Sequence, residues 1–430
     1  MQYYTVILII MSLMLGASAF AEKLKIPSPI FLIVVGMVLG FIPAMPLMDL
    51  NPEVVMLLFL PPLLYDAAFN ISFKDFRTHI STISTLAIGL VFITTAGIAI
   101  VAYCLIPSLT WPVAFVLGAT LSATDAVAAI GITKGLGLSH RTVSILEGES
   151  LVNDASALVA YRFAVAAVTG VAFVWWDALL DFVLVLTGGF LIGWIISKLL
   201  EKVLYYFRDN DMLVISLTLL MPFVTYLVAE HFDVSGVIAV VVLGLQMSRL
   251  SKSNFPEALK QRSRHFWDVI IFLLNGLIFV LIGLEFPWIL RKIHETHIWH
   301  YIGIAAIITV ATFIIRWAHV YLQQRSLRKS YMGKYRWRRV SKDALLDSQT
   351  SLIIAWAGMR GIVSLAIALG LPLYLDNDAP FPMRNEIIFI AISVVLLSLL
   401  GQGITLPWVV KKAREWNKPT VVSEERYELE

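Results

Sequence analysis

Apolar residues occur along this chain in long continuous runs that are separated by short polar stretches. Each run is roughly 20 residues long, which is enough for a helix to cross about 30 Å of hydrocarbon. The runs are continuous rather than alternating, which favours helices over a transmembrane barrel. The pattern predicts an all-α polytopic membrane protein with about 13 transmembrane helices. The predicted spans are 3–21, 28–45, 53–70, 79–106, 111–134, 141–169, 179–205, 211–231, 234–250, 266–287, 298–322, 348–374 and 385–410.

Lysine and arginine residues fall in alternate loops, as the positive-inside rule requires for a fixed orientation. The loops expected in the cytoplasm hold Lys23, Lys25, Lys74, Arg77, Lys134, Arg141, Lys198, Lys202, Arg208 and the clusters 249–264, 325–342 and 411–418. The other loops hold only Arg291, Lys292 and Arg384. This predicts an outer N-terminus on an uncleaved first span and a cytoplasmic C-terminus. The transmembrane domain is predicted at 1–412 and a short cytoplasmic tail at 413–430, with long basic loops at 251–265 and 323–347 that contact lipid rather than nucleic acid.

Composition supports a membrane protein and excludes several classes of activity. The 430 residues are 59% hydrophobic and 15% charged, against about 25% charged in ordinary soluble domains. The single cysteine, Cys104, allows neither an intramolecular disulfide nor a cysteine metal site. Since no phosphate-binding loop or HExxH sequence is present, we expect neither an enzyme nor a cofactor.

The stretch 120–162 carries ionisable residues within two predicted apolar helices. Such residues are costly in a membrane and face a pathway or a partner. Ser150, Asn153 and Asp154 lie at positions i, i+3 and i+4, so they can share one helix face. A hydroxyl, an amide and a carboxylate form a hard-oxygen cluster, which suits an alkali cation or a proton rather than a soft metal.

Two predicted spans are interrupted near their middles. One contains the sequence GATLSATD, which includes Thr124 and Asp125, and the other contains GMRG, which includes Arg360. Unwound helices at matching positions of two halves indicate a transport site built from inverted repeats. We therefore predict that spans 1–6 and 8–13 are inverted repeats and that the two interrupted helices cross at the membrane midplane.

The remaining intramembrane charges allow more than one interpretation. Asp125 either offsets the dipoles of half-helices or ligates, and Thr124 is a further ligand candidate. An ion pair between Glu149 and Arg360 is predicted, since an unpaired buried charge is costly. Asp66, after Pro61-Pro62, is either a gate residue or an interface residue. Arg162 and Arg316 are predicted to be structural or interfacial.

These motifs resemble the cation:proton antiporter family, in the branch of bacterial NhaP-type and animal NHE-type sodium/proton exchangers. The resemblance rests on TDAVAAIG, EGESLVNDASALVAYRFAVAA and AWAGMRGIVSLAIAL, together with PPLLYDAA and GLIFVLIGLEFP in the same order and spacing. It implies a core domain that moves against a dimerisation domain. It also implies that Asp154 binds ion and proton, with Asn153, Ser150, Thr124 and Asp66 beside it and Asp125, Glu149 and Arg360 in support. Ser150, Thr124 and Asp154 would then be the Na⁺ ligands.

The resemblance implies electroneutral exchange of Na⁺ for H⁺ by competition at Asp154, in a homodimer of a bacterial inner membrane. K⁺ and Li⁺ remain alternative substrates, and a proton-coupled carrier of another solute is the alternative function. A cation channel or an intramembrane enzyme would need a continuous polar lining or a nucleophile–base pair, and the sequence supplies neither. Many relatives carry a large cytoplasmic regulatory domain, and the short segment after the last span predicts no such regulation here.

Overall fold

The computed structural model describes a helical protein whose α-helices range from 7 to 37 residues in length. Within the described residues every regular element is helical, apart from one isolated bridge between Tyr374 and Pro380. The described residues are 2–24, 28–42, 51–71, 80, 82–133, 136, 138–169, 175–207, 210–293, 295–332, 345–375 and 379–415. Several of the predicted basic loops, including residues 72–79, 333–344 and 416–430, lie outside them.

The helices follow the predicted spans in order. In the first half they are α1 (Gln2–Leu24), α2 (Ser28–Gly40), α3 (Pro52–Asn70), the π-helical turn η1 (Thr85–Gly89), α5 (Leu90–Leu105), α6 (Trp111–Thr120), α7 (Ala126–Ile132) and α8 (His140–Val168). The second half holds α9 (Trp175–Tyr206), α10 (Asp211–His231), α11 (Gly236–Asn254), α12 (Glu257–Lys292), α13 (Glu295–Tyr331), α14 (Ser348–Trp356), α15 (Ile362–Leu369), α16 (Arg384–Ser398), the π-helical turn η3 (Leu399–Gly403) and α17 (Ile404–Glu415).

Membrane-spanning length and composition are confirmed for eight of the 13 predicted spans. Across the described residues, eight helices are long and apolar enough to cross a membrane, and three shorter apolar helices lie at Leu8–Ala21, Ser28–Gly40 and Trp111–Thr120. The prediction of a basic loop at 251–265 was wrong, because α11 continues to Asn254 and α12 starts at Glu257. Likewise, α13 extends to Tyr331, into the segment predicted as the loop 323–347. Polar residues at these helix ends continue the helix once it leaves the apolar layer, so hydropathy marks the membrane boundary and not the helix end.

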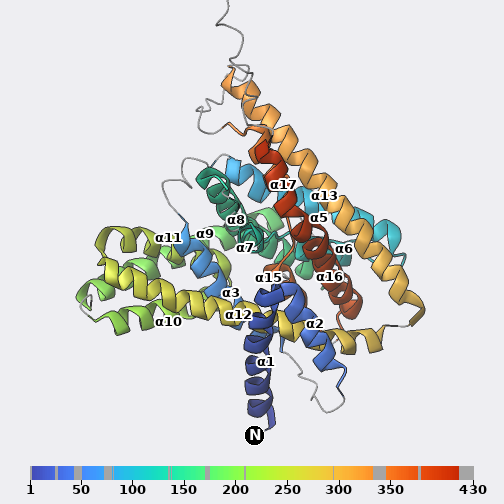
Figure 1. Ribbon diagram of the computed structural model, residues 1–430, viewed down its shortest axis with the longest axis horizontal. Helices are drawn as coiled ribbons and strands as arrows, with labels where there is room; N and C mark the ends of the chain where they lie inside the picture. The colour runs from blue at the N-terminus through green and yellow to red at the C-terminus, as the bar shows by residue number, and fades with distance from the viewer. Residues whose placement is uncertain are drawn as a thin grey trace, which may run out of the picture.

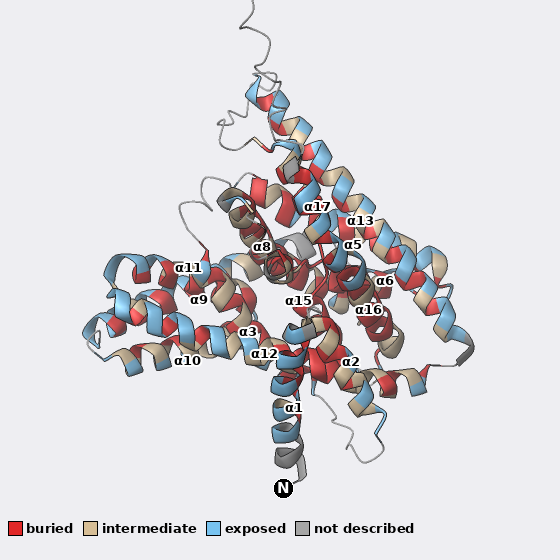
Figure 2. Ribbon diagram, in the orientation of Figure 1, coloured by how far each residue is buried: buried red, intermediate tan, exposed pale blue. Residues whose placement is uncertain are grey.

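The helices form two groups (Figure 1). The scaffold bundle comprises α1–α3 and α9–α12, in which α12 packs on α2, and α11 packs on α9 and α3. The core bundle comprises α5–α8 and α13–α17, in which α6 packs on α5 and α8, and α13 packs on α5 and α16. Figure 2 shows that buried residues gather where the bundles meet, around α15, α2 and α16, whereas much of α13 and the outer faces of α9–α12 are exposed.

Two helices of the core bundle are broken and cross each other, as predicted. The first break separates α6 from α7, and the second separates α14 from α15. The backbone N–H of Asp125 donates to the carbonyl of Met359 at 2.8 Å, so the two breaks contact each other directly. The crossing is close because Gly361 has no side chain; a Cβ there would lie 1.9 Å from Asp125 Oδ2. The inverted-repeat relationship between the halves stays a prediction.

Candidate ion-binding site

Asp154 lies in the middle of α8, which is held against the broken helix α6–α7 in the core bundle. The residue is 8% exposed, and its Oδ1 is buried without a hydrogen-bond partner among the described residues. An unsatisfied buried acceptor is costly, and a buried carboxylate that lacks a partner is costlier still. The Asp154 carboxylate therefore favours a bound proton or cation.

The α6–α7 break presents its oxygens to the same face of α8. Ser150 Oγ donates to the Thr124 carbonyl at 2.8 Å, and Asn153 Nδ2 donates to Thr124 Oγ1 at 3.0 Å. Ser150 Oγ also accepts from the backbone N–H of Ala126 at 3.4 Å. Ser150 and Asn153 on α8 are thus brought together with Thr124, as predicted. They meet because the backbone between α6 and α7 is not helical, and its polar groups are therefore free to bind α8.

A small cavity of about 100 Å³, which we call the binding cavity, lies beside these residues. Its polar lining includes Asp66, Thr124, Ser150 and Asp154. Asn153 is only 1% exposed, and its amide nitrogen holds the Thr124 hydroxyl. Asn153 therefore holds Thr124, which lines the binding cavity, and is not itself part of the cavity wall.

Asp66 reaches the binding cavity from the scaffold bundle. It lies on α3, which stays helical through Pro61 and Pro62, so the prolines do not break the span. Its Oδ1 accepts from Asn70 Nδ2 at 3.0 Å, one turn further along the helix. The binding cavity thus receives a carboxylate from the scaffold bundle, in addition to those of Asp154 and Asp125.

Asp125 caps the half-helix α7, as one of its two predicted roles requires. Its Oδ1 accepts from the backbone N–H of Ala128 at 2.9 Å. The first N–H groups of a helix lack partners within the helix, and a carboxylate at this end also interacts favourably with the helix dipole. The other side of the same break, where α6 ends, is bound by a cation.

Arg360 binds the carbonyl groups at the end of the other half-helix. Its Nη1 donates to the carbonyls of Ser122 at 2.6 Å and Ala123 at 3.0 Å, just after α6 ends. The backbone N–H of Arg360 donates to Ser398 Oγ at 3.0 Å. Its guanidinium thus satisfies carbonyls that the break leaves without helical partners.

The predicted ion pair between Glu149 and Arg360 is wrong in its partner. Glu149 instead accepts from Arg316 on α13, from Nη1 at 2.5 Å and from Nη2 at 2.9 Å. Both side chains are almost fully buried, at 1% and 3% exposed. Arg316 Nε also donates to the carbonyl of Ile354 in α14. The arginine passes over Gly358, where a Cβ would lie 2.1 Å from Arg316 Cδ.

A signal for Arg316 was present in the sequence. Arg316 is an arginine within a predicted apolar span. Arg360 was considered a site residue for the same reason, that a charge inside the membrane is costly and marks a functional or structural partner. The sequence alone did not show which arginine faces Glu149, because that depends on how α13 packs against α8 and α14.

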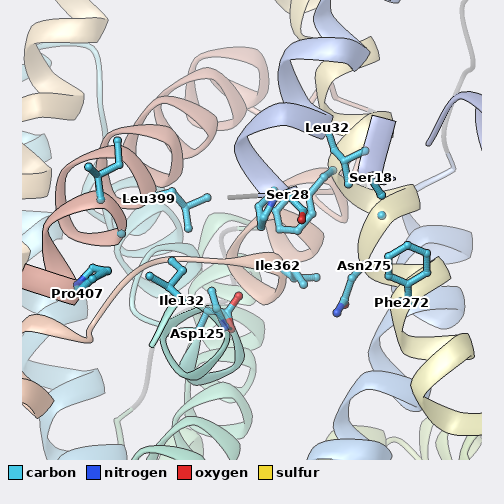
Figure 3. A pocket seen from close by; sticks show the side chains of 16 residues that line it. Ser18, Ser28, Leu32, Asp125, Ile132, Phe272, Asn275, Ile362, Leu399 and Pro407 are labelled. Atoms are coloured by element: carbon cyan, nitrogen blue, oxygen red, sulfur yellow. The ribbon is translucent and has the colours of Figure 1, made fainter. Parts of the chain in front are cut away.

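A second and larger cavity of about 610 Å³, which we call the vestibule, leads toward the site. Asp125, Asn275 and Ile362 line both the vestibule and the binding cavity. Figure 3 shows Asp125 beside Ile362, with Asn275 and Phe272 approaching from α12. The rest of the vestibule comes from Ser18, Ser28, Pro29, Leu32, Ala128, Ile132, Gly276, Phe279, Leu399, Gly403, Ile404 and Pro407.

A family model described as the transmembrane sodium/hydrogen exchanger matches residues 8–412. A Bacillus pumilus protein named as a sodium, potassium, lithium and rubidium/H⁺ antiporter is 33% identical over 424 residues, covering 96% of this chain and 62% of that protein. An uncharacterised Na⁺/H⁺ exchanger of Escherichia coli is 32% identical over 440 residues, covering 97% and 78%. The antiporter NhaH of Halobacillus aidingensis is 33% identical over 421 residues, covering 94% and 96%.

The fold is similar to that of a solved structure. The sodium proton antiporter MjNhaP1 of Methanocaldococcus jannaschii, in its structure at pH 8, superimposes with a TM-score of 0.72 at 21% sequence identity. The match covers 96% of this chain and 99% of that protein. At this identity, the likeness establishes the arrangement of helices.

Proposed function

This chain belongs to the sodium/hydrogen exchanger family, whose members are secondary antiporters and not enzymes, and we propose that it exchanges a monovalent cation for a proton at Asp154. The observation that carries this proposal is the Asp154 carboxylate, buried beside the binding cavity with one oxygen unpartnered among the described residues. The whole activity rests on that group accepting one ligand at a time.

Competition at one carboxylate is sufficient for coupling. A proton or a monovalent cation neutralises the Asp154 carboxylate, whereas the empty site carries a buried charge that is costly to move through an apolar barrier. The loaded core bundle can therefore pass between its two positions, and the empty one cannot. Each crossing with a cation is then matched by a return with a proton, without ATP.

The cation ligands in this proposal are Asp154, Ser150 and the oxygens of Thr124, with Asp66 as a further carboxylate. Hydroxyl, carbonyl and carboxylate oxygens suit hard cations. The contacts of Ser150 and Asn153 with Thr124 support this assignment, because they fix the oxygens around α8 before the ion arrives. We propose Na⁺ as the main substrate and K⁺ and Li⁺ as alternatives, since the same oxygens serve each.

The chain is a multi-pass membrane protein, and we further propose a homodimer in a bacterial inner membrane with its N-terminus outside. The distribution of lysine and arginine supports this orientation. Exposed apolar side chains such as Phe190, Leu191 and Trp194 on α9 support contact with lipid. In this orientation the vestibule opens to the cytoplasm.

The test is a pH-gradient dequenching assay in proteoliposomes, with Na⁺, K⁺ and Li⁺ added in turn. We expect proton flux that depends on at least one of these ions. Proton flux driven only by an organic solute would favour a carrier of another substrate. Conductance far above transporter rates would favour a channel.

A further inference from the structure

Asn275 occupies the junction between the vestibule and the binding cavity, and it lines both. It belongs to α12 of the scaffold bundle, whereas Asp154 belongs to α8 of the core bundle. In Figure 3 its side chain extends from α12 toward the region of Asp125 and Ile362, with the amide nitrogen at its leading end. A cation that travels from the vestibule to Asp154 passes this side chain.

The carboxamide of Asn275 is an unusual group to find there. Its Oδ1 is buried and has no hydrogen-bond partner among the described residues. Its neighbours along the cavity walls include Ile271, Phe272 and Ile362, which offer no side-chain donor. An unsatisfied buried acceptor is costly, so an apolar residue of similar size would stabilise the fold better. A transient ligand would satisfy this oxygen.

We propose that Asn275 is a cation ligand contributed by the scaffold bundle, an inference that rests on the exchange proposed above. Rotation of the amide about its Cβ–Cγ bond turns Oδ1 from its buried position into the entrance of the binding cavity, where Oδ1 holds the cation and shares it with Asp154. Hard cations favour additional oxygen ligands of this kind. Asp154 and Asn275 lie on different bundles. They can therefore bind the same cation only in the state in which the vestibule opens to the binding cavity.

This position predicts an effect that depends on the side of the membrane. Asn275 should raise the affinity for a cation that arrives through the vestibule. It should contribute nothing to a cation that arrives from the opposite side, after the core bundle has moved away from α12. A residue that merely supports the fold would affect both sides alike.

The test uses Asn275→Leu, which keeps the approximate size and removes the oxygen. Sodium-dependent proton flux is measured in sealed vesicles of both orientations. We expect the KM for Na⁺ on the vestibule side to rise about tenfold, the factor that corresponds to about 1.4 kcal/mol, with KM on the other side unchanged. Without sodium, the melting temperature in detergent should equal or exceed that of the unsubstituted protein. The matched control is Asn254→Leu, the same change at an exposed residue at the end of α11, which should leave both KM values unchanged.

An unchanged KM on the vestibule side, with active unsubstituted protein, would overturn the role of Asn275 alone. An equal rise on both sides together with a lower melting temperature would also overturn it, in favour of a structural role. Failure of the unsubstituted protein to couple any alkali cation to proton flux would instead overturn the proposed function.

Discussion

Most of the charges buried near the site have a structural partner that is visible in the contacts. Asp125 binds the start of α7, Arg360 binds the carbonyls after α6, and Glu149 binds Arg316. Asp154 differs from them because its Oδ1 is a buried acceptor without a hydrogen-bond partner among the described residues, whereas Arg360, whose Nε is also unpartnered there, is held through its Nη1. At the scale of single residues, this difference separates a group that can exchange its ligand from groups that hold the broken helices in place.

The change Asp154→Asn should abolish cation-dependent proton flux and leave expression and folding intact. The amide keeps the shape of the side chain and removes the charge that proton and cation compete for. Flux is measured in proteoliposomes, with melting temperature as the control for folding. Residual sodium-dependent flux in purified Asp154→Asn protein would contradict the assignment.

Glu149 and Arg316 should be coupled in stability. Removing either partner leaves a buried charge alone, at a cost of about 3–5 kcal/mol, so Glu149→Gln and Arg316→Gln should each lower the melting temperature strongly. The double substitution should recover part of the loss. A second cycle with Glu149 and Arg360 is the control, and it should show the smaller coupling. Larger coupling in that second cycle would restore the partner predicted from sequence.

At the scale of elements, the crossing of two broken helices creates the site. Each break frees backbone groups, and the breaks satisfy one another through the Asp125–Met359 hydrogen bond and through the Arg360 side chain. Neither half would be stable alone, because each supplies what the other lacks. This interdependence predicts that substitutions at the crossing affect transport even without touching the ion.

The change Gly361→Ala should disturb the site strongly. The added Cβ would lie within 2.5 Å of three Asp125 side-chain atoms, so Asp125 must leave its position at the start of α7. We expect loss of most exchange activity and a lower melting temperature. Gly303→Ala on α13 is the control, since a Cβ there meets nothing within 4 Å. Normal exchange by Gly361→Ala protein would show that the two broken helices can move apart at this point without loss of transport.

The elements could be predicted from sequence to the extent that they depend on local signals. Long apolar runs located the helices, and polar and glycine residues within two runs located the breaks. Helix ends at 251–265 were missed because helix formation continues beyond the apolar layer. The partner of Glu149 was missed because Arg316 and Arg360 both lie within predicted spans, and the sequence does not show which of them contacts Glu149. Only the packing of α13 beside α8 decides between them. Asn275 was missed because one amide in an apolar run is a weak signal until the cavities are seen.

At the scale of the whole molecule, an ion pair connects the two bundles. Arg162 on α8 donates to Glu230 on α10. The other oxygen of Glu230 accepts from the backbone N–H of Gly236 at the start of α11. Arg162 lies two turns beyond Asp154 on α8, toward the end of that helix remote from Ile132 and the vestibule. Movement that opens the site at that end must separate this pair.

Neutralising the pair should therefore shift the balance between the two states. With Glu230→Gln, we expect the KM for Na⁺ to rise on the vestibule side and to fall on the opposite side, because the state with an open vestibule becomes less populated. The charge swap Arg162→Glu with Glu230→Arg should return both values toward normal. Lys198→Gln is the matched control, since it breaks an ion pair within α9 alone. Parallel changes on both sides would exclude a role in the balance of states.

The charge carried per cycle is also a property of the whole molecule, and the structure leads us to expect none. Asp125 caps α7 and Glu149 pairs with Arg316, so both carboxylates already have partners within the protein, and Asp154 is the group expected to alternate between proton and cation. Asp66 is bound to Asn70 on the scaffold bundle, and it does not travel with α8. We therefore expect one proton to be exchanged for one monovalent cation, with no net charge crossing the membrane.

Exchange should accordingly be insensitive to membrane potential. The measurement imposes a potassium diffusion potential of either sign across sodium-loaded vesicles, provided that potassium itself is not transported, and compares initial proton flux. If Asp66 also exchanged a proton in each cycle, more than one proton would accompany each cation, and flux would change with the sign of the potential. In that case Asp66→Asn protein should lose the voltage dependence, which would identify the second titrating group. Equal flux at both signs is the result that a single exchanging carboxylate requires.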